Sequence, residues 1–399
     1  MSSLDANDAN DANDANDAND ANDANDANAA RVAARGGKAA GALISHRDGI
    51  VGPWSPVGAA SWSPLTVVEA PGQLSRWTPL VRSKVFHFEL ISGLHFGVGP
   101  LPAANPVATL WHLNKRAVGG AIGNGVTAPA GVFEPLVTMN RPRDLKLRGQ
   151  QLNLVHGWSD LRSDRVHEIL SQRTPPYAFW GSVVPLHPTR TIRTMELINV
   201  VLQLASSIAQ RFKHSLCVRR PHEYSAQIQP IIQTPGHGSL PSGHATEAFA
   251  VAGVLIGLLN ERARLNVAAG LNPPAGLNAP PGLVQQLIAQ AARIAINRTV
   301  AGVHFPVDSL AGQLLGLGIA EYFVARCQPA GGAIPNVDHW TLDCDHAQIN
   351  DFSGAEIFNV AAAGRLQPPP PYAVQAVAAA NVEGSDILNW LWNAALGEW

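Results

Sequence analysis

The stretch PSGHATEAFAVAGVLIGLL, residues 241–259, decides how the chain folds. Its long apolar run, from Ala245 to Leu259, follows directly on Ser242 and Gly243. Serine is a preferred residue at the start of a helix, and glycine lets other groups come close to the backbone. The free amides of a helix's first turn attract an anion. The stretch therefore predicts a helix whose first turn faces a negatively charged group.

Three further segments have the pattern of helices. The segment from Met195 to Leu216 repeats apolar residues at helical spacing, with Lys213 near its end. Two later segments, Val284 to Ile296 and Ser309 to Arg326, are also predicted to be helical. The first of these would deliver Arg298, which follows it by two residues.

Cations and histidines stand beside these helix ends. Lys213, Arg220 and Arg298 are the cations, and His244 and His304 can shuttle a proton or act as ligands. A tetrahedral or trigonal-bipyramidal oxyanion carries charge on several oxygens, so it needs fixed cations, backbone donors and groups that move a proton. The five residues predict one oxyanion pocket.

Two neighbours complete this hypothesis. Asp308 follows His304 by four residues and is expected to hold the histidine ring from behind. Arg219 stands beside Arg220, and only the spacing from Lys213 favours Arg220, so both arginines stay open here.

The spacing of these residues resembles a known signature. Six residues separate Lys213 from Arg220-Pro221, PSGH follows, and Arg298, His304 and Asp308 close the pattern with five and three residues between them. This is similar to the three-part signature of the superfamily shared by vanadium-dependent haloperoxidases and type 2 phosphatidic acid phosphatases, including bacterial class A acid phosphatases. The resemblance covers roughly a quarter of the chain. Asn297 departs from it, because the phosphatase pattern usually has serine before the arginine.

The resemblance implies a role for each residue. In a haloperoxidase His304 would ligate vanadate, and in a phosphatase it would be the nucleophile. His244 would be the acid-base residue, Asp308 would orient His304, and Lys213 would also polarise the bound oxidant. The equatorial oxygens of the anion would be bound by Lys213, Arg220, Ser242, the Gly243 amide and Arg298.

Three features favour the haloperoxidase branch, and one is that no apolar run reaches the length that membrane-spanning lipid phosphatases of the superfamily need. Nearly two hundred residues precede Lys213, whereas soluble phosphatases of the superfamily are compact single bundles. His237 lies seven residues before His244, where bromide-using members carry a histidine. The prediction is a vanadate-dependent enzyme that oxidises bromide or iodide with hydrogen peroxide to a hypohalous acid equivalent, with His237 as a halide-site candidate. The alternative is a soluble acid phosphatase with His304 as nucleophile and His244 as general acid.

The expected fold is all-α, with two units that resemble four-helix bundles, long irregular loops and little or no β-structure. The expected divisions are a disordered tail (1–30), an irregular arm with a first bundle (31–190), a catalytic bundle (191–330) and a C-terminal extension (331–399). Local patterns predict a short strand at Val85 to Leu90 and helices at Ala104 to Arg116, Leu161 to Gln172 and Ser385 to Ala395.

Composition bounds the class of protein. The 399 residues are 46% hydrophobic and 15% charged, enough for a large buried core. Eight DAN triplets at Asp5 to Asn28 contain no large apolar residue, and they predict a disordered tail. No secretory signal is visible and no apolar run reaches the ~20 residues of a membrane span, so we expect a soluble, cytoplasmic chain.

The remaining expectations concern partners and cysteines. The basic residues are neither clustered nor interleaved with aromatic residues, which argues against a nucleic-acid partner. A homodimer or larger homo-oligomer is what the resemblance implies. The cysteine count is odd, which suits a reducing compartment, and Cys217 is expected to be a buried thiol at a helix end.

Overall fold

The computed structural model describes residues 46, 49–50, 71–99, 106–114, 121–122, 126–127, 132–269, 281–330, 337–347, 351–352, 359–360, 366–367, 373–375 and 382–399. The DAN repeat lies outside these residues, as does most of the predicted arm. The chain divides into two compact units, Met1–Lys84 and Val85–Trp399. The first unit contains the 3₁₀ helix η2 (Pro71–Arg76) and the start of α3 (Pro79–Ile91). The second unit contains the rest of α3 and all later helices and strands of the described residues.

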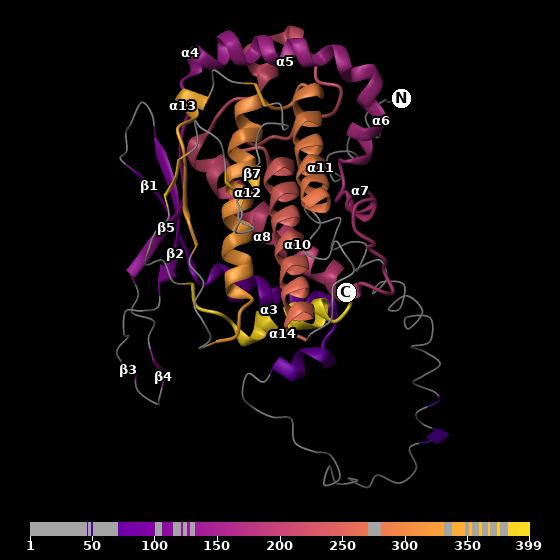
Figure 1. Cartoon of the computed structure of the whole chain (residues 1–399). Helices are drawn as coiled ribbons and strands as arrows, with labels where there is room; N and C mark the ends of the chain where they lie inside the picture. Colours follow the sequence, from indigo (N-terminus) through magenta and orange to yellow (C-terminus); the bar gives the residue numbers. More distant parts are fainter. Residues whose placement is uncertain are drawn as a thin grey trace. The chain divides into compact units, whose positions relative to one another are not determined.

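Four long helices make the core of this unit and lie side by side in Figure 1. They are α8 (Ile192–Leu216), α10 (Gly243–Ala268), α11 (Pro281–Val300) and α12 (Pro306–Arg326). α10 packs against the other three, and α14 (Asp386–Leu396) crosses α8 and α10. These helices confirm the predictions for residues 195–216, 284–296, 309–326 and 385–395. Nearly every side chain of α12 is buried, so it is the centre of the core.

Glycines on α12 bring its backbone into contact with α10. A Cβ atom added at Gly312 would lie 2.6 Å from the carbonyl oxygen of Ser242, and one added at Gly316 would lie 2.5 Å from that of Thr246. Both distances are far below van der Waals contact, so any larger residue would push the helices apart. α10 and α12 therefore pack at a separation that only glycine allows at these two positions.

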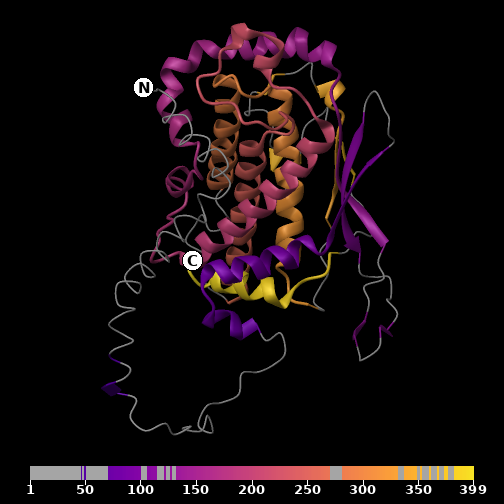
Figure 2. The same ribbon diagram turned by 180° about the vertical axis from the view of Figure 1, so that it is seen from behind.

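A sheet covers one side of the bundle, as Figure 2 shows from behind. Its five strands lie in the order β1 (Leu94–Gly99), β2 (Val107–Asn114), β5 (Val132–Asn140), β6 (His339–Leu342) and β9 (Ala373–Gln375). β5 and β6 are parallel and the other pairs are antiparallel. The sheet packs closely against α12, because a Cβ atom added at Gly318 would lie 2.5 Å from the side chain of Val137 in β5.

The sheet contradicts the prediction of an all-α fold with two bundles. The predicted helix at 104–116 is wrong, because its described part includes β2, whose residues alternate between buried and less buried positions. Two of the buried positions carry His112 and Asn114 instead of apolar residues, and this hides the alternation from the sequence. The predicted strand at 85–90 is also wrong, since these residues lie within α3.

A chain of short helices connects the sheet to the bundle. In Figure 1 it passes over one end of the bundle and descends beside α11. The predicted helix at 161–172 is confirmed as α6 (Arg162–Ser171). The others are α4 (Asp144–Lys146), the π-helical η3 (Leu147–Gln151), α5 (Leu152–Trp158), η4 (Ser159–Leu161) and α7 (Tyr177–Gly181).

The remaining elements are short. They are α9 (Pro221–Tyr224), η5 (Ala226–Ile228), α13 (Cys344–Ala347), and the two-residue strands β3 (Ala121–Ile122), β4 (Val126–Thr127), β7 (Asn359–Val360) and β8 (Leu366–Gln367). The predicted domain divisions at 30, 190 and 330 stay predictions.

One helix contradicts the argument by which the chain was predicted to be soluble and cytoplasmic. Within the described residues, Gly243–Asn266 of α10 is long and apolar enough to cross a membrane. The apolar run in the sequence ends at Leu259, whereas α10 continues beyond it to Ala268. The argument for a soluble, cytoplasmic chain therefore fails. In the bundle 61% of the most apolar part of this helix is buried against the other helices.

Candidate active site

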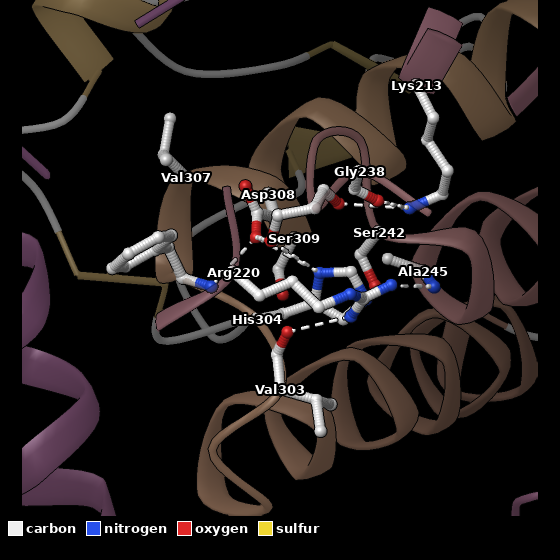
Figure 3. Close-up of polar contacts among 12 residues, drawn as sticks. Lys213, Arg220, Gly238, Ser242, Ala245, Val303, His304, Val307, Asp308 and Ser309 are labelled. Atoms are coloured by element: carbon white, nitrogen blue, oxygen red, sulfur yellow. Dashed lines mark hydrogen bonds and ion pairs between the residues drawn. The ribbon is translucent and has the colours of Figure 1, made fainter. Parts of the chain in front are cut away.

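Lys213 and Arg220 enter the site from the end of α8. Lys213 lies in the last turn, and Cys217 ends the helix in the left-handed conformation with a φ of 46°. The Lys213 side chain is 2% exposed, and its ammonium donates to the carbonyl oxygens of Gly238 and Ser239, both at 3.0 Å (Figure 3). The left-handed turn redirects the chain between Lys213 and Arg220, and both side chains are buried.

Arg220 is the inward member of the arginine pair. It is 2% exposed, and its Nη1 donates to the carbonyl oxygen of Val303 at 2.9 Å. The same Nη1 lies 3.5 Å from Nε2 of His304. Arg219 is exposed. The structure thus separates the two arginines that spacing alone could not, and only Arg220 reaches His304.

His304 is held from behind by Asp308. Nδ1 of His304 lies 3.0 Å from Oδ2 of Asp308, and the backbone N–H of Phe305 donates to the same oxygen at 2.8 Å. The hydroxyl of Ser239 also donates to Oδ2 and lies 3.3 Å from His304 Nδ1. One carboxylate oxygen therefore accepts three hydrogen bonds. All these side chains are buried within the described fold.

This arrangement decides the tautomer of His304. An ionised carboxylate oxygen can only accept, so Nδ1 of His304 carries the proton. Nε2 then has a lone pair, and it lies on the side of the ring that faces Arg220. A neutral imidazole whose Nε2 has a lone pair can act as a nucleophile or a ligand.

The start of α10 lies against the start of α12. The backbone N–H of Ser242 donates to the carbonyl oxygen of Asp308 at 2.9 Å. The Ser242 hydroxyl accepts from the N–H of Ala245 at 3.4 Å, which caps the helix that Gly243 begins (Figure 3). His244 follows, and its Nε2 lies 2.9 Å from the carbonyl oxygen of Gln172. Because a carbonyl only accepts, Nε2 carries the proton and Nδ1 has the lone pair.

Arg298 enters from the last turn of α11 and is supported by α6. It is 1% exposed, and its Nη2 donates to the carbonyl oxygen of Ile169 and to Oε1 of Gln172, both at 3.1 Å. Asn297 also donates to Oε1 of Gln172, at 2.9 Å, and to Glu168 at 2.8 Å. The residue that departs from the phosphatase pattern therefore ties α11 to α6.

Burial and positive charge keep the histidines neutral. Burial, followed by the charge of Arg298, lowers the pKa of His244 from 6.5 to about 3. Burial lowers the pKa of His304 well below its usual value, and Arg220 and Lys213 add to this effect. At neutral pH both rings therefore offer lone pairs to an incoming group.

The cations of the site are also perturbed. Burial lowers the pKa of Lys213 well below its usual value, and the charge of Arg220 lowers it further. Burial lowers the pKa of Arg220 to about 10. Burial raises the pKa of Asp308 to about 6, although its hydrogen bonds oppose that change. The balance of charge is positive, so a bound anion would relieve the repulsion between the cations.

His237 lies at the edge of the site beside Arg220. Its Nδ1 is 3.2 Å from Arg220 Nη2 and 3.1 Å from the carbonyl oxygen of Gly238, and the tautomer decides which of the two it bonds. Burial lowers the pKa of His237 to about 4. A cavity of about 410 Å³ opens here, walled by the turn after α8 and by residues 234–238. Cys217 is exposed on this wall, which contradicts the expected buried thiol.

The site suits an oxyanion better than a bare metal cation. Among the described residues, no three His, Cys, Asp or Glu side chains gather as metal ligands. One imidazole Nε2 surrounded by lysine and arginine side chains is a donor set for phosphate, or for vanadate with its similar shape. Ser239 and Gln172 were missed in the sequence analysis, and their contacts with the site span more than 60 residues of chain.

Part of the chain is similar to a known family. Residues 195–330 match the family model of the PAP2 superfamily. Members of this superfamily are typically enzymes, namely phosphatases and phosphotransferases. A similar solved structure is the "first transmembrane PAP2 type phosphatidylglycerolphosphate phosphatase from Bacillus subtilis", with 19% identity and a TM-score of 0.25. That likeness covers 45% of this chain and 79% of the other. No curated relative matches the chain.

Proposed function

We propose that the chain is a phosphate-ester hydrolase or phosphotransferase in which His304 is the nucleophile. The observation that carries this proposal is the His304–Asp308 pair, which leaves Nε2 of a neutral imidazole facing Arg220. The PAP2 superfamily match supports the same class of reaction. Phosphate-ester chemistry thus takes the place of haloperoxidase activity as the main proposal, and the residues of the predicted oxyanion pocket stay the same.

The mechanism follows from the hydrogen bonds of the two histidines. Lys213, Arg220 and Arg298 would pair with the phosphate oxygens and stabilise the charge of the transition state. Nε2 of His304 attacks phosphorus while the bond to the leaving oxygen breaks. His244 gives that oxygen a proton from Nδ1, because its Nε2–H is already bound to Gln172.

The second half restores the enzyme. Water attacks the phosphorus of the phosphohistidine, and Nδ1 of His244 takes a proton from this water. The P–N bond breaks, inorganic phosphate leaves, and His304 is neutral again. The negative charge of the bound phosphate raises the pKa of His244 from its low value, so the ring can hold the proton that it gives.

Hydrolysis of para-nitrophenyl phosphate tests the proposal. The full-length protein should release phosphate, and quenching in base should trap one phosphohistidine per chain, because this species is labile in acid. His304→Ala should lose both the turnover and the trapped species. His214→Ala is the matched control, because His214 is an exposed histidine of the same helix end as Lys213. Equal turnover in His304→Ala and the wild type would refute the assignment.

A second candidate is the vanadate-dependent oxidation of bromide or iodide. The position of His237, next to Arg220 at the mouth of a cavity, favours it. Lys213, Arg220, Ser242, Gly243 and Arg298 would hold vanadate, and His304 would ligate it. Bound vanadate would supply the Lewis acid that activates hydrogen peroxide.

Two histidines of the chain would take part in this reaction besides the residues that hold vanadate. His244 would exchange a proton, and His237 would contact the halide or its oxidised product. Bromination of a dimedone indicator with peroxide and orthovanadate tests this candidate. His237→Ala should lower bromination and leave phosphate-ester hydrolysis within about threefold of the wild type. No vanadate-dependent bromination by the wild type would exclude the candidate.

A further inference from the structure

Gln172 is a buried polar residue that the mechanism above uses only through its backbone. It caps the C-terminal end of α6 and has no exposed surface. It precedes residues 195–330, the span of the superfamily match, so α6 brings it to the site from outside that domain. Figure 1 shows α6 beside α11, the helix that carries Arg298.

The orientation of the Gln172 amide follows from its neighbours. Oε1 accepts from Arg298 Nη2 at 3.1 Å and from Asn297 Nδ2 at 2.9 Å. Both neighbours can only donate through these atoms, so the oxygen and the nitrogen of the amide cannot be exchanged. Nε2 is therefore the other amide atom, and it carries two hydrogens.

Nε2 of Gln172 has no hydrogen-bond partner among the described residues. A buried amide donor without a partner is costly, and most buried polar groups have one. This donor belongs to a residue whose Oε1 holds Arg298 and whose carbonyl oxygen holds His244. Gln172 therefore contacts two groups that are both expected to contact the same anion.

We propose that Nε2 of Gln172 donates a hydrogen bond to the oxyanion bound in this pocket. The inference rests on the proposed function, because it requires a phosphate or vanadate held by Arg298. Gln172 then has two tasks: its oxygen positions Arg298 and its nitrogen binds the anion. α6 becomes part of the anion site, and the domain of residues 195–330 is incomplete without it.

The test is binding of inorganic phosphate and of orthovanadate to the full-length protein, by equilibrium dialysis. Gln172→Met removes the donor and keeps the length of the side chain, so affinity should fall about 10- to 100-fold. Gln172→Glu keeps an oxygen acceptor for Arg298 and Asn297 but has no donor at neutral pH, and it should also bind weakly.

Acidification tests the Gln172→Glu variant in a second way. Protonation of the new carboxyl restores an O–H donor and removes a negative charge beside the anion, so the affinity of Gln172→Glu relative to the wild type should recover between about pH 8 and pH 5. Gln172→Met should show no such recovery. Gln313→Met is the matched control, because Gln313 is buried with an unpartnered Nε2 in the described fold and has no hydrogen bond to the cations or histidines above. It should bind both anions as the wild type does.

Three results would overturn the inference, and they can be told apart. If the wild type binds both anions and Gln172→Met binds them equally well, Gln172 is no donor, and the proposed function stands. Wild-type affinity of Gln172→Glu at pH 8 would likewise reduce Gln172 to a support for Arg298. If the wild type binds neither anion, the proposed function and this inference fail together.

Discussion

Replacing Asp308 tests how the site prepares His304. A single oxygen of Asp308, Oδ2, accepts all three of its hydrogen bonds, from Ser239, Phe305 and His304. The other oxygen has no hydrogen-bond partner within the described residues. An asparagine at this position could therefore place its amide oxygen where Oδ2 lies and keep the three bonds. Asp308→Asn removes the charge and retains the geometry, whereas Asp308→Ala removes both.

The magnitudes follow from the strength of these bonds. A hydrogen bond to a charged group contributes about 1.5–3 kcal/mol and one between neutral groups about 0.5–1.5 kcal/mol. Asp308→Asn therefore weakens the hold on His304 by about 1 kcal/mol, which corresponds to a kcat about 5- to 10-fold lower. Asp308→Ala loses about 2–3 kcal/mol, so kcat should fall about 30- to 150-fold.

Substrate binding should change in the opposite direction. Asp308 is the carboxylate in contact with His304, and its charge opposes that of Lys213 and Arg220. Removing it strengthens the attraction for an anionic substrate, so KM should stay equal or fall. Steady-state kinetics with para-nitrophenyl phosphate measure both parameters. Equal loss of kcat in the two variants would refute the reasoning, because the charge and not the hydrogen bonds would then hold His304.

Three further outcomes are expected from the same structure. Arg220→Lys should lower phosphate affinity at least about tenfold, because a lysine cannot reproduce the planar guanidinium that donates to Val303 and reaches His304. The control Arg219→Lys should change phosphate affinity less than about twofold, because Arg219 is exposed. Similar losses of affinity in both variants would contradict the choice of Arg220. Ser239→Ala removes one bond to Asp308 and should lower kcat about three- to tenfold in steady-state assays, and an unchanged kcat would exclude a role for this hydroxyl. The pKa of His244 is lowered from 6.5 to about 3, so the unfolded chain binds its proton first, and this residue's stabilising contribution is complete above pH 6.5 and is lost as the pH falls toward 3. Stability against urea should therefore fall more steeply between pH 6.5 and about pH 5 in the wild type than in His244→Gln, and parallel curves would disprove the assignment.

The contacts that the sequence could predict are those between neighbours along the chain. Asp308 follows His304 by one helical turn, so spacing alone indicates that the carboxylate can reach the ring. Arg220 needed the structure, because Arg219 has the same chemistry and only burial separates them. Four of the long helices were predicted because their apolar periodicity extends over many turns.

The features that the sequence did not predict depend on contacts between segments far apart in the chain. The hydrogen bond that Arg298 donates to Gln172 joins residues 126 positions apart, and no sequence pattern relates the two residues. The strand β2 was predicted as a helix because buried His112 and Asn114 interrupt its apolar alternation. Burial lowers the pKa of His112, which keeps the ring neutral in the interior of the protein. Polar residues in such positions cannot be told from surface residues without the packing around them.

Two of the glycines of α12, Gly312 and Gly316, fix the distance between the helices that begin beside the two histidines. α10 begins with His244 in its first turn, α12 begins two residues after His304, and Gly312 and Gly316 hold the two backbones in contact. A methyl group at either glycine would widen that gap by a fraction of an ångström and carry one histidine away from the other. If the two histidines act on one phosphate as proposed, turnover should fall in such a variant, and its rate would report how closely the two helices pack.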